Sequence, residues 1–562
     1  MKQIRSFKFS FVILAFLLLF FGRFFLTTKL FDTHDIEYHA ARTANYYLAL
    51  QQGQVPPRWS PNLNYSFGLP TFLFAYPLPY MVATVFYLFV DNIQLSINLA
   101  LFLFWCIGGV GMFYYAKTRT KRDALSLLVA MSYFAAPYTL LNFFERGAFG
   151  ETSFYALLPL VLLILHWQNK ISSSWFVVGS YIVLVTFLLT HPQSLVLTVP
   201  VLGIWTVLGY TKAELKKFWQ KKIALLVAVG LSVQFFWTPL VFEAKETFVS
   251  EAISLPRLLH SFPVFSRLFW PSMFATQIPG SAMLVTSFTT TLGLSALLLF
   301  LVGIYTVNNK HRTTRQLFWL TIFLATIFLM HPGSSFIWSH IGSLKVIQFP
   351  WRLLSLSVLA SSMLFIECQN TLIKKRTLLQ IFSVVFFCIS LINLFVWGKP
   401  KGYISRTDYD WFEYFGTASS FDEFIPKGFV HEKNLQITDK LSLIPAGESE
   451  IVSWNGSRME YRVNVSEPTQ VLQKTAYFPG WKVFVDNTEV NILHNTIAYP
   501  GRITFALTPG DHLVTVIFTN QTPIRQAADT ASLFGLGLLF ILLVPTGLQK
   551  RVSDILQRRQ SK

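Results

Sequence analysis

Three polar side chains suited to chemistry follow the first apolar segment of the chain. If residues 35–50 form a helix, Asp35, His39 and Arg42 lie at positions i, i+4 and i+7, on one face. A carboxylate there can accept a proton from a hydroxyl group, and a guanidinium can bind phosphate oxygens. The solvated face of a helix beside a membrane has the same pattern. This segment alone leaves both interpretations open.

A second group of polar residues lies at the ends of later apolar segments: Arg146, Glu151, His191 and Arg352. Each has a structural alternative. Arg146 could form an ion pair with Glu145 or Glu151. His191 precedes a proline and could cap a helix, and Arg352 could anchor a helix at the lipid interface.

The composition assigns the chain to a structural class. Of its 562 residues, 53% are hydrophobic and only 13% are charged, whereas soluble domains carry about 25% charged residues. We therefore expect a polytopic α-helical membrane protein. Its first apolar segment should be an uncleaved anchor, because no small-x-small cleavage site follows it. Apolar segments that approach the length needed to cross a bilayer are residues 9–26, 72–90, 98–116, 124–142, 154–167, 174–190, 195–209, 222–241, 287–307, 316–331, 353–367, 378–397 and 530–547.

The formal net charge of +18 comes from short basic clusters between these segments, so it indicates membrane topology rather than nucleic-acid binding. The positive-inside rule places the clusters and both termini on the cytoplasmic side of the membrane. If every apolar segment crossed, the chain would end outside, so one segment must fail to cross. Residues 72–90 contain Pro77 and Pro79, and we expect this segment to be juxtamembrane or re-entrant. The prediction is about 12 crossings.

The same topology predicts which loops face outside the cell. These are residues 27–71, 143–153, 191–194, 242–286, 332–352 and 398–529. They hold Asp35 and the other polar residues named above. We therefore expect these side chains to meet at the outer membrane–water boundary, where a lipid-linked substrate presents its head group.

The composition changes from residue 399 onwards. Residues 399–529 alternate apolar and polar positions and carry turn signals such as Asp486-Asn487, a pattern typical of short strands joined by hairpins. We expect an extracytoplasmic β-sandwich there, following a transmembrane domain over residues 1–398. Residues 530–562 should form the last transmembrane helix and a basic cytoplasmic tail.

The three cysteines give no sign of a disulfide or a zinc site. Cys106, Cys368 and Cys388 lie within or at the ends of apolar segments, and none forms a CxxC pair. They are best interpreted as small buried hydrophobic residues. The chain also has no HExxH motif and no glycine-rich phosphate loop.

Several motifs, in order along the chain, resemble those of a known family. Residues 35–80, DIEYHAARTANYYLALQQGQVPPRWSPNLNYSFGLPTFLFAYPLPY, resemble the first outer loop of YfhO-type membrane proteins and of the related 6-pyruvoyl-tetrahydropterin-synthase-related membrane proteins. Nothing in the sequence suggests the zinc site of a soluble pterin synthase. Further similar motifs are ERGAFGE at 145–151, THPQS at 190–194, QFPWRLL at 348–354, AYFPGWKVFVD at 476–486 and PGDHLVTVIF at 509–518.

The resemblance implies the GT-C fold of integral membrane glycosyltransferases. Such enzymes typically take a sugar from a polyprenyl-phosphate carrier on the outer face of the membrane and pass it to a cell-envelope polymer, lipid or protein. An acidic residue in the first outer loop acts at the centre of that reaction, and Asp35 matches its position. Some members hold a divalent cation. Asp35, Glu151 and a histidine are the candidate ligands here, although their spacing has no metal-ligand signature.

Inverting glycosyl transfer assigns expected roles to these residues. A base must take the proton from the acceptor hydroxyl as it attacks the sugar, and Asp35 is the candidate. Cationic groups must stabilise charge on the departing lipid phosphate, which suits the guanidinium groups. His39 would orient the carboxylate or the phosphate. The residues expected to bind substrate or phosphate are His39, Arg42, Arg146, Glu151, His191 and Arg352.

Two other functions fit parts of the pattern. A transporter or flippase for lipid-linked sugars usually carries ionisable residues near mid-membrane, whereas the charged residues here lie at the outer ends of the apolar segments. A non-catalytic glycan-binding envelope protein would explain the β-sandwich. It would not explain the charged cluster after the first apolar segment.

Overall fold

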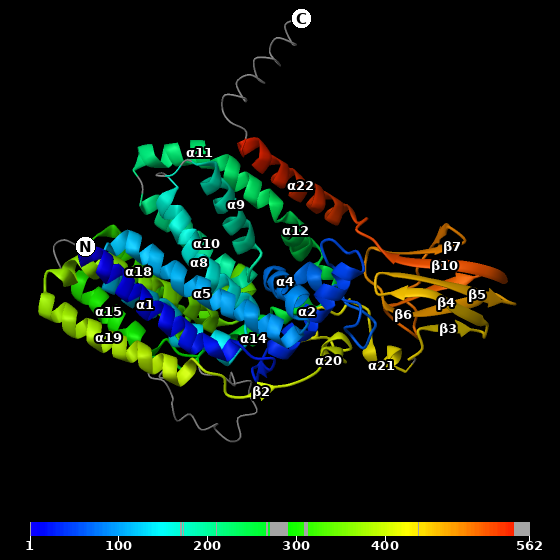
Figure 1. Ribbon diagram of the computed structural model, residues 1–562. Helices are drawn as coiled ribbons and strands as arrows, with labels where there is room; N and C mark the ends of the chain where they lie inside the picture. Colours follow the sequence, from blue (N-terminus) through cyan, green and yellow to red (C-terminus); the bar gives the residue numbers. More distant parts are fainter. Residues whose placement is uncertain are drawn as a thin grey trace, which may run out of the picture.

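Apolar helices form most of the computed structural model, and a β-sandwich lies at one end of them (Figure 1). The structure describes residues 2–168, 171, 173–209, 211–265, 268–269, 290–307, 313–436 and 438–543. The expected basic tail at 544–562 lies outside the described residues.

The described helices have the length and composition of a multi-pass membrane protein. Helices that are individually long and apolar enough to span a bilayer are α5 (Ile93–Thr120), α8 (Phe149–Trp167), α18 (Leu353–Ile373) extended at its start from Pro350, α19 (Arg376–Trp397) and α22 (Pro523–Leu543). Bent pairs that pass the same test together are α6 (Asp123–Phe134) with α7 (Pro137–Phe144), residues 222–232 of α11 (Lys212–Ser232) with α12 (Gln234–Phe242), and α16 (Thr314–Leu329) with residues 332–340.

Shorter apolar helices complete the bundle: α9 (Ser174–Leu188), α10 (Pro192–Leu208), α15 (Gly293–Val307) and the apolar residues 9–25, most of which belong to α1 (Lys2–Gly22). Among the described residues, five helices qualify as spans, or up to eight if each bent pair is one span. The multi-pass architecture is therefore confirmed, while the figure of about 12 crossings stays a prediction.

The apolar segment at 124–142 forms two helices rather than one. α6 (Asp123–Phe134) and α7 (Pro137–Phe144) meet at an angle of 52°. Pro137 explains the break, because a proline ring forces the preceding residue out of the helical conformation, and Ala136 has a ψ of 136°. The bend leads the chain after α7 to the start of α2 (Ile36–Gln51), where the two segments form backbone hydrogen bonds.

The helix on which the spacing of Asp35, His39 and Arg42 depends is present as α2 (Ile36–Gln51). It packs against α4 (Leu78–Val90) and α5. α4 has 13 residues and is therefore about 20 Å long, against a bilayer core of about 30 Å. Residues 72–90 thus contain no single spanning helix, since the short α3 (Thr71–Phe74) precedes α4 separately.

Two antiparallel sheets form the sandwich near the C-terminus. One has the strand order β4-β5-β10-β7-β8 and the other β3-β6-β9. The Tyr461 hydroxyl donates a 3.0 Å hydrogen bond to Oε1 of Gln473, which links the two sheets through their shared core. The strands are β3 (Leu441–Ile444), β4 (Glu448–Asn455), β5 (Arg458–Val465), β6 (Thr469–Ala476), β7 (Trp481–Val485), β8 (Thr488–Val490), β9 (Arg502–Leu507) and β10 (Gly510–Phe518).

The hairpin turn expected at Asp486-Asn487 is present between β7 and β8. Both residues have positive φ, 50° and 64°, as a two-residue turn between twisted strands requires. The strands of the sandwich lie between residues 441 and 518, within the region 399–529 expected to be β-rich. Between residues 403 and 436 the chain contains β2 (Tyr403–Ile404), α20 (Asp408–Phe412) and α21 (His431–Asn434). β2 pairs with β1 (Leu30–Phe31), so this segment adjoins the chain between α1 and α2.

Two ion pairs join α22 to the helical body. Nε of Arg525 lies 2.9 Å from a carboxylate oxygen of Glu243, which follows α12, and Arg58 pairs with Asp529. Arg525 also donates to the backbone carbonyl of Pro479, at 2.6 Å, in the loop between β6 and β7. These contacts attach the sandwich and α22 to the helix end that borders the cavity described next.

Candidate functional site

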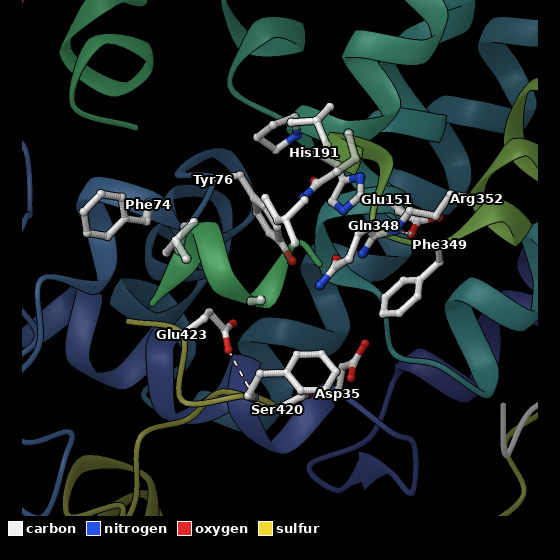
Figure 2. Close-up of a pocket in the computed structure, with 18 of the residues that line it drawn as sticks. Asp35, Phe74, Tyr76, Glu151, His191, Gln348, Phe349, Arg352, Ser420 and Glu423 are labelled. Atoms are coloured by element: carbon white, nitrogen blue, oxygen red, sulfur yellow. Dashed lines mark hydrogen bonds and ion pairs between the residues drawn. The ribbon is translucent and has the colours of Figure 1, made fainter. Parts of the chain in front are cut away.

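One cavity brings together side chains that lie far apart in the sequence. Its volume is about 730 Å³. Figure 2 shows Asp35 on one side of this space and the group of Glu151, His191 and Arg352 on the other. All the residues singled out from the sequence line the cavity: Asp35, His39, Arg42, Arg146, Glu151, His191 and Arg352.

Asp35 is the N-cap residue of α2, but its side chain does not cap the helix. Its backbone N–H donates a 2.9 Å hydrogen bond to the carbonyl of Arg146, and the N–H of His34 donates to the carbonyl of Glu145 at 3.3 Å. Within the described residues, the half-buried carboxylate makes no hydrogen bond or ion pair. Burial raises the pKa of Asp35, against the opposing effect of nearby Arg146.

A glycine allows the loop between α7 and α8 to approach α2 this closely. Gly147 has a φ of +64°, a conformation that residues with a Cβ seldom adopt. A Cβ at this position would collide with the Thr33 hydroxyl and lie 3.1 Å from Cβ of Ile36. The backbone of residues 145–147 therefore lies directly against the start of α2.

Glu151 is the centre of a buried polar group and is only 1% exposed. It accepts hydrogen bonds from the Tyr138 hydroxyl at 2.9 Å and from Nη1 of Arg146 at 3.0 Å. Burial disfavours the charge of Arg146, but the Glu151 carboxylate outweighs it and raises the pKa of Arg146. The ion-pair alternative for Arg146 is thus confirmed with Glu151, while Glu145 pairs with Lys401 instead.

Arg352 lies on the other side of Glu151. Its Nε is 3.7 Å from a Glu151 oxygen, and its Nη1 donates to the carbonyl of Ile347 at 3.1 Å. The guanidinium also lies over the ring of Phe349, at 5.1 Å from its centroid. With 8% exposure, Arg352 is buried beside the cavity rather than held at a lipid surface.

His39 and Arg42 share one partner, the Tyr80 hydroxyl, at 2.8 Å from Nδ1 of His39 and 3.4 Å from Nη1 of Arg42. Burial and the neighbouring Arg42 hold the pKa of His39 well below its ordinary value, so the imidazole is neutral. Arg42 lies 3.9 Å from Glu423, and its Nε is buried without a hydrogen-bond partner in the described structure.

His191 caps α10, as the structural alternative proposed. Its Nδ1 accepts a 3.4 Å hydrogen bond from the backbone N–H of Ser194. Burial and the charge of Arg352 lower the pKa of His191 to about 3, so the ring is neutral. With Nδ1 accepting, the proton lies on Nε2. His191 therefore combines a structural role with a ring nitrogen available to the cavity it lines.

Several cavity residues were not singled out from the sequence. Tyr76 lies in the AYPLPY motif and Gln348 begins QFPWRLL, so the family-like motifs contained a signal for them. Tyr80 ends the same AYPLPY motif and contacts His39 and Arg42 without lining the cavity. Glu423 had none, because it lies in the region expected to be β-rich and meets α2 only through the tertiary fold.

One wall of the cavity is apolar. It includes Trp237, Leu240 and Val241 of α12 and Val196 of α10. Val241 is 63% exposed and Val196 is 45% exposed, so this wall continues onto the apolar outer surface of the helices. The cavity therefore has a polar side suited to anions and hydroxyl groups and an apolar side that continues onto exposed apolar surface.

The described residues contain no group of three or more His, Cys, Asp or Glu side chains placed to hold a metal ion. Glu151 is instead committed to Arg146 and Tyr138. Asp35, Glu151 and a histidine, the cation ligands considered from the sequence, do not form such a group.

Comparison with known proteins identifies the family. No curated protein matches the chain. A family model described as the 6-pyruvoyl-tetrahydropterin synthase related domain, a membrane protein, matches residues 73–401. That region includes Arg146, Glu151, His191 and Arg352, whereas Asp35 and the sandwich lie outside it. The match covers more than half of the chain, which therefore belongs to the 6-pyruvoyl-tetrahydropterin synthase related family of membrane proteins.

Proposed function

We propose that the protein is a GT-C-type membrane glycosyltransferase that moves a sugar from a polyprenyl-phosphate carrier to a cell-envelope polymer, lipid or protein. The observation that carries this proposal is the unpaired Asp35 carboxylate, which lines a cavity together with guanidinium groups. A base and a set of cations around one space are what inverting glycosyl transfer requires.

In the proposed reaction, Asp35 takes the proton from the acceptor hydroxyl as the acceptor oxygen bonds to C1 of the sugar. The bond between C1 and the phosphate oxygen breaks, and the lipid phosphate leaves with the electron pair. A raised pKa makes Asp35 a stronger base than an exposed aspartate, which favours this proton transfer.

Arg42 and Arg352 are the best placed to hold the leaving phosphate. Their distances to carboxylates, 3.9 Å and 3.7 Å, are long for hydrogen-bonded ion pairs, and each has a buried Nε without a hydrogen-bond partner in the described structure. Arg146 has its hydrogen bonds to Glu151 already. We assign the Arg146–Glu151 pair to positioning Arg352 rather than to direct phosphate binding.

The apolar wall supports a lipid-linked donor. Val196 and Val241 connect the cavity to the exposed apolar surface between α10 and α12. A polyprenyl chain can leave the cavity along that surface while its phosphate stays beside the arginines. A water-soluble nucleotide-sugar has no hydrocarbon chain to bury against such a wall, so the wall would add nothing to its binding affinity.

The arrangement of the chain supports a site on the outer face of the cytoplasmic membrane. Figure 1 shows the N-terminus and the β-sandwich at opposite ends of the helical body. The basic residues Lys117 and Arg119 lie in the last turn of α5, whereas Phe149, next to the cavity residue Ala148, packs against Phe104 in the first half of α5. With the basic ends cytoplasmic, the cavity and the sandwich both face outside.

The decisive experiment uses the purified protein in liposomes with a radiolabelled polyprenyl-phosphate sugar and a hydroxyl acceptor. Wild-type protein should transfer the label, and Asp35→Asn should lose transfer while keeping donor binding. Asp32→Asn is the matched control, because Asp32 is an exposed carboxylate of the same loop that does not line the cavity. Movement of intact donor across the bilayer without transfer would instead indicate a flippase, and glycan binding without either would indicate a scaffold.

A further inference from the structure

Gln348 has a backbone conformation that glycine would adopt at lower cost. Its φ is +69° and its ψ is −42°. The N–H of Phe349 donates a 2.8 Å hydrogen bond to the carbonyl of Ile347, so Gln348 is the central residue of a γ-turn of the rare, strained kind. A side chain with a Cβ at this position destabilises the turn relative to glycine.

The side chain at this strained position faces the cavity. Gln348 lines it and is half-buried, and Figure 2 shows it between Asp35 and His191. Within the described residues its amide has no hydrogen-bond partner. No hydrogen bond of the amide within the protein therefore offsets the cost of the strained backbone. Strained residues of this kind concentrate at binding sites.

The chemistry of the amide indicates which part of a ligand it meets. A primary amide can both donate and accept hydrogen bonds, and so can a sugar hydroxyl. A phosphate offers only acceptors at neutral pH and is better matched by the guanidinium of Arg352, four residues further along.

We propose that Gln348 is a specificity-determining residue whose amide hydrogen-bonds a hydroxyl of the sugar bound between Asp35 and His191. The inference rests on the proposed function and deepens it, since it names the residue that distinguishes one sugar from another. A site built to bond a hydroxyl rejects a ligand that lacks it, because the buried polar group is then left unpaired.

The test uses Gln348→Gly, because a purely structural role and a role in sugar recognition predict different effects of this substitution on sugar binding. Glycine removes both the strain and the amide. If Gln348 had only a structural role, the variant would keep its sugar binding with an unchanged or higher Tm. If its amide forms a hydrogen bond with the sugar, the Tm is again unchanged or higher, but sugar binding weakens by about 10- to 100-fold.

Binding is measured in nanodiscs with short-chain polyprenyl phosphate and with its glucosyl, mannosyl and N-acetylglucosaminyl esters. We expect Gln348→Gly to weaken the best-bound ester and to leave sugar-free polyprenyl phosphate unaffected. Lys121→Gly is the control, because Lys121 has a φ of +56°, is exposed and does not line the cavity. It relieves backbone strain without touching the site and should bind every probe as the wild type does.

Two results would overturn the inference, and they differ from failure of the proposed function. Equal binding of the best ester by Gln348→Gly and wild type would refute a contact with the sugar. Equal weakening of the esters and of sugar-free phosphate would place Gln348 at the phosphate. If the wild type favours no ester over sugar-free phosphate and transfers no sugar, the glycosyltransferase proposal fails and the Gln348 inference fails with it.

Discussion

The backbone N–H of Asp35 is bonded to the carbonyl oxygen of Arg146 at 2.9 Å. The same Arg146 pairs through its side chain with Glu151 at 3.0 Å. One residue therefore holds the start of α2 by its main chain and the buried carboxylate of α8 by its side chain. The position of the proposed base thus depends on the loop between α7 and α8.

Replacing Gly147 with alanine should displace this loop. The new Cβ would collide with Thr33 at a backbone φ of +64°, so we expect a destabilisation of about 1–3 kcal/mol and a marked loss of sugar transfer. Thermal unfolding and transfer assays measure the two effects. The control is Gly53→Ala, where φ is +81° but a Cβ would meet nothing within 4 Å. Equal losses in both variants would show that φ alone matters and that the close approach to α2 does not.

Glu151→Gln should destabilise the protein through uncompensated charge. Removing one partner from a buried ion pair costs about 3–5 kcal/mol, and here Arg146 and Arg352 both lose their carboxylate. We expect a clearly lower midpoint of thermal unfolding. Glu145→Gln is the comparison, because its partner Lys401 is 69% exposed and stays solvated when the Glu145 charge is removed, so no buried charge is left unpaired. A midpoint shift no larger than that of Glu145→Gln would contradict the proposed role of Glu151.

The rate of transfer should fall at acidic pH because the base must be deprotonated. Burial raises the pKa of Asp35 above its ordinary 3.8, so the acidic limb of the kcat/KM profile should have its midpoint above that value. Asp32→Asn should keep this limb. A rate independent of pH down to 3.8 would argue against Asp35 as the base.

Asp35 should also affect the stability of the fold, and the raised pKa of its carboxyl group determines whether the effect is stabilising or destabilising at a given pH. A carboxyl group whose pKa is higher in the folded than in the unfolded protein stabilises the fold when protonated, and this stabilisation is lost as pH rises through the folded-state pKa. Near neutral pH, Asp35→Asn should therefore unfold at a higher temperature than the wild type. The difference should shrink toward acidic pH, and a lower Tm at neutral pH would contradict this prediction.

Arg525→Leu should loosen the attachment of α22 and the sandwich. Arg525 is fully buried and pairs with Glu243, so its loss leaves a buried carboxylate unpaired at a cost of about 3–5 kcal/mol. The double variant Arg525→Leu, Glu243→Leu should recover part of that stability, as a double-mutant cycle would show. Lys245→Ala is the control, since the Lys245–Glu246 pair is exposed. Additive effects of the two leucine substitutions would mean that the pair contributes nothing by its direct interaction.

Sequence patterns predicted those features that depend on local chemistry. The composition indicates a multi-pass membrane protein, and Asp486-Asn487 indicates a hairpin. Each follows from side-chain hydrophobicity or from the backbone preferences of a few adjacent residues. Topology arguments also placed Asp35, Arg146 and the other polar residues on one surface, and the structure brings them to one cavity.

The remaining features depend on contacts between distant segments, which no local pattern contains. Glu423 meets Arg42 only because the chain after α19 returns to the segment between α1 and α2. The unpaired Asp35 and the paired Arg146 look alike as charged residues in the sequence, yet the fold satisfies one and leaves the other open to the cavity. The sequence by itself determined the membrane class and the set of polar residues, since these follow from composition and periodicity. Only the tertiary structure decided which of those groups stay free for a ligand, because burial and pairing arise when the helices pack.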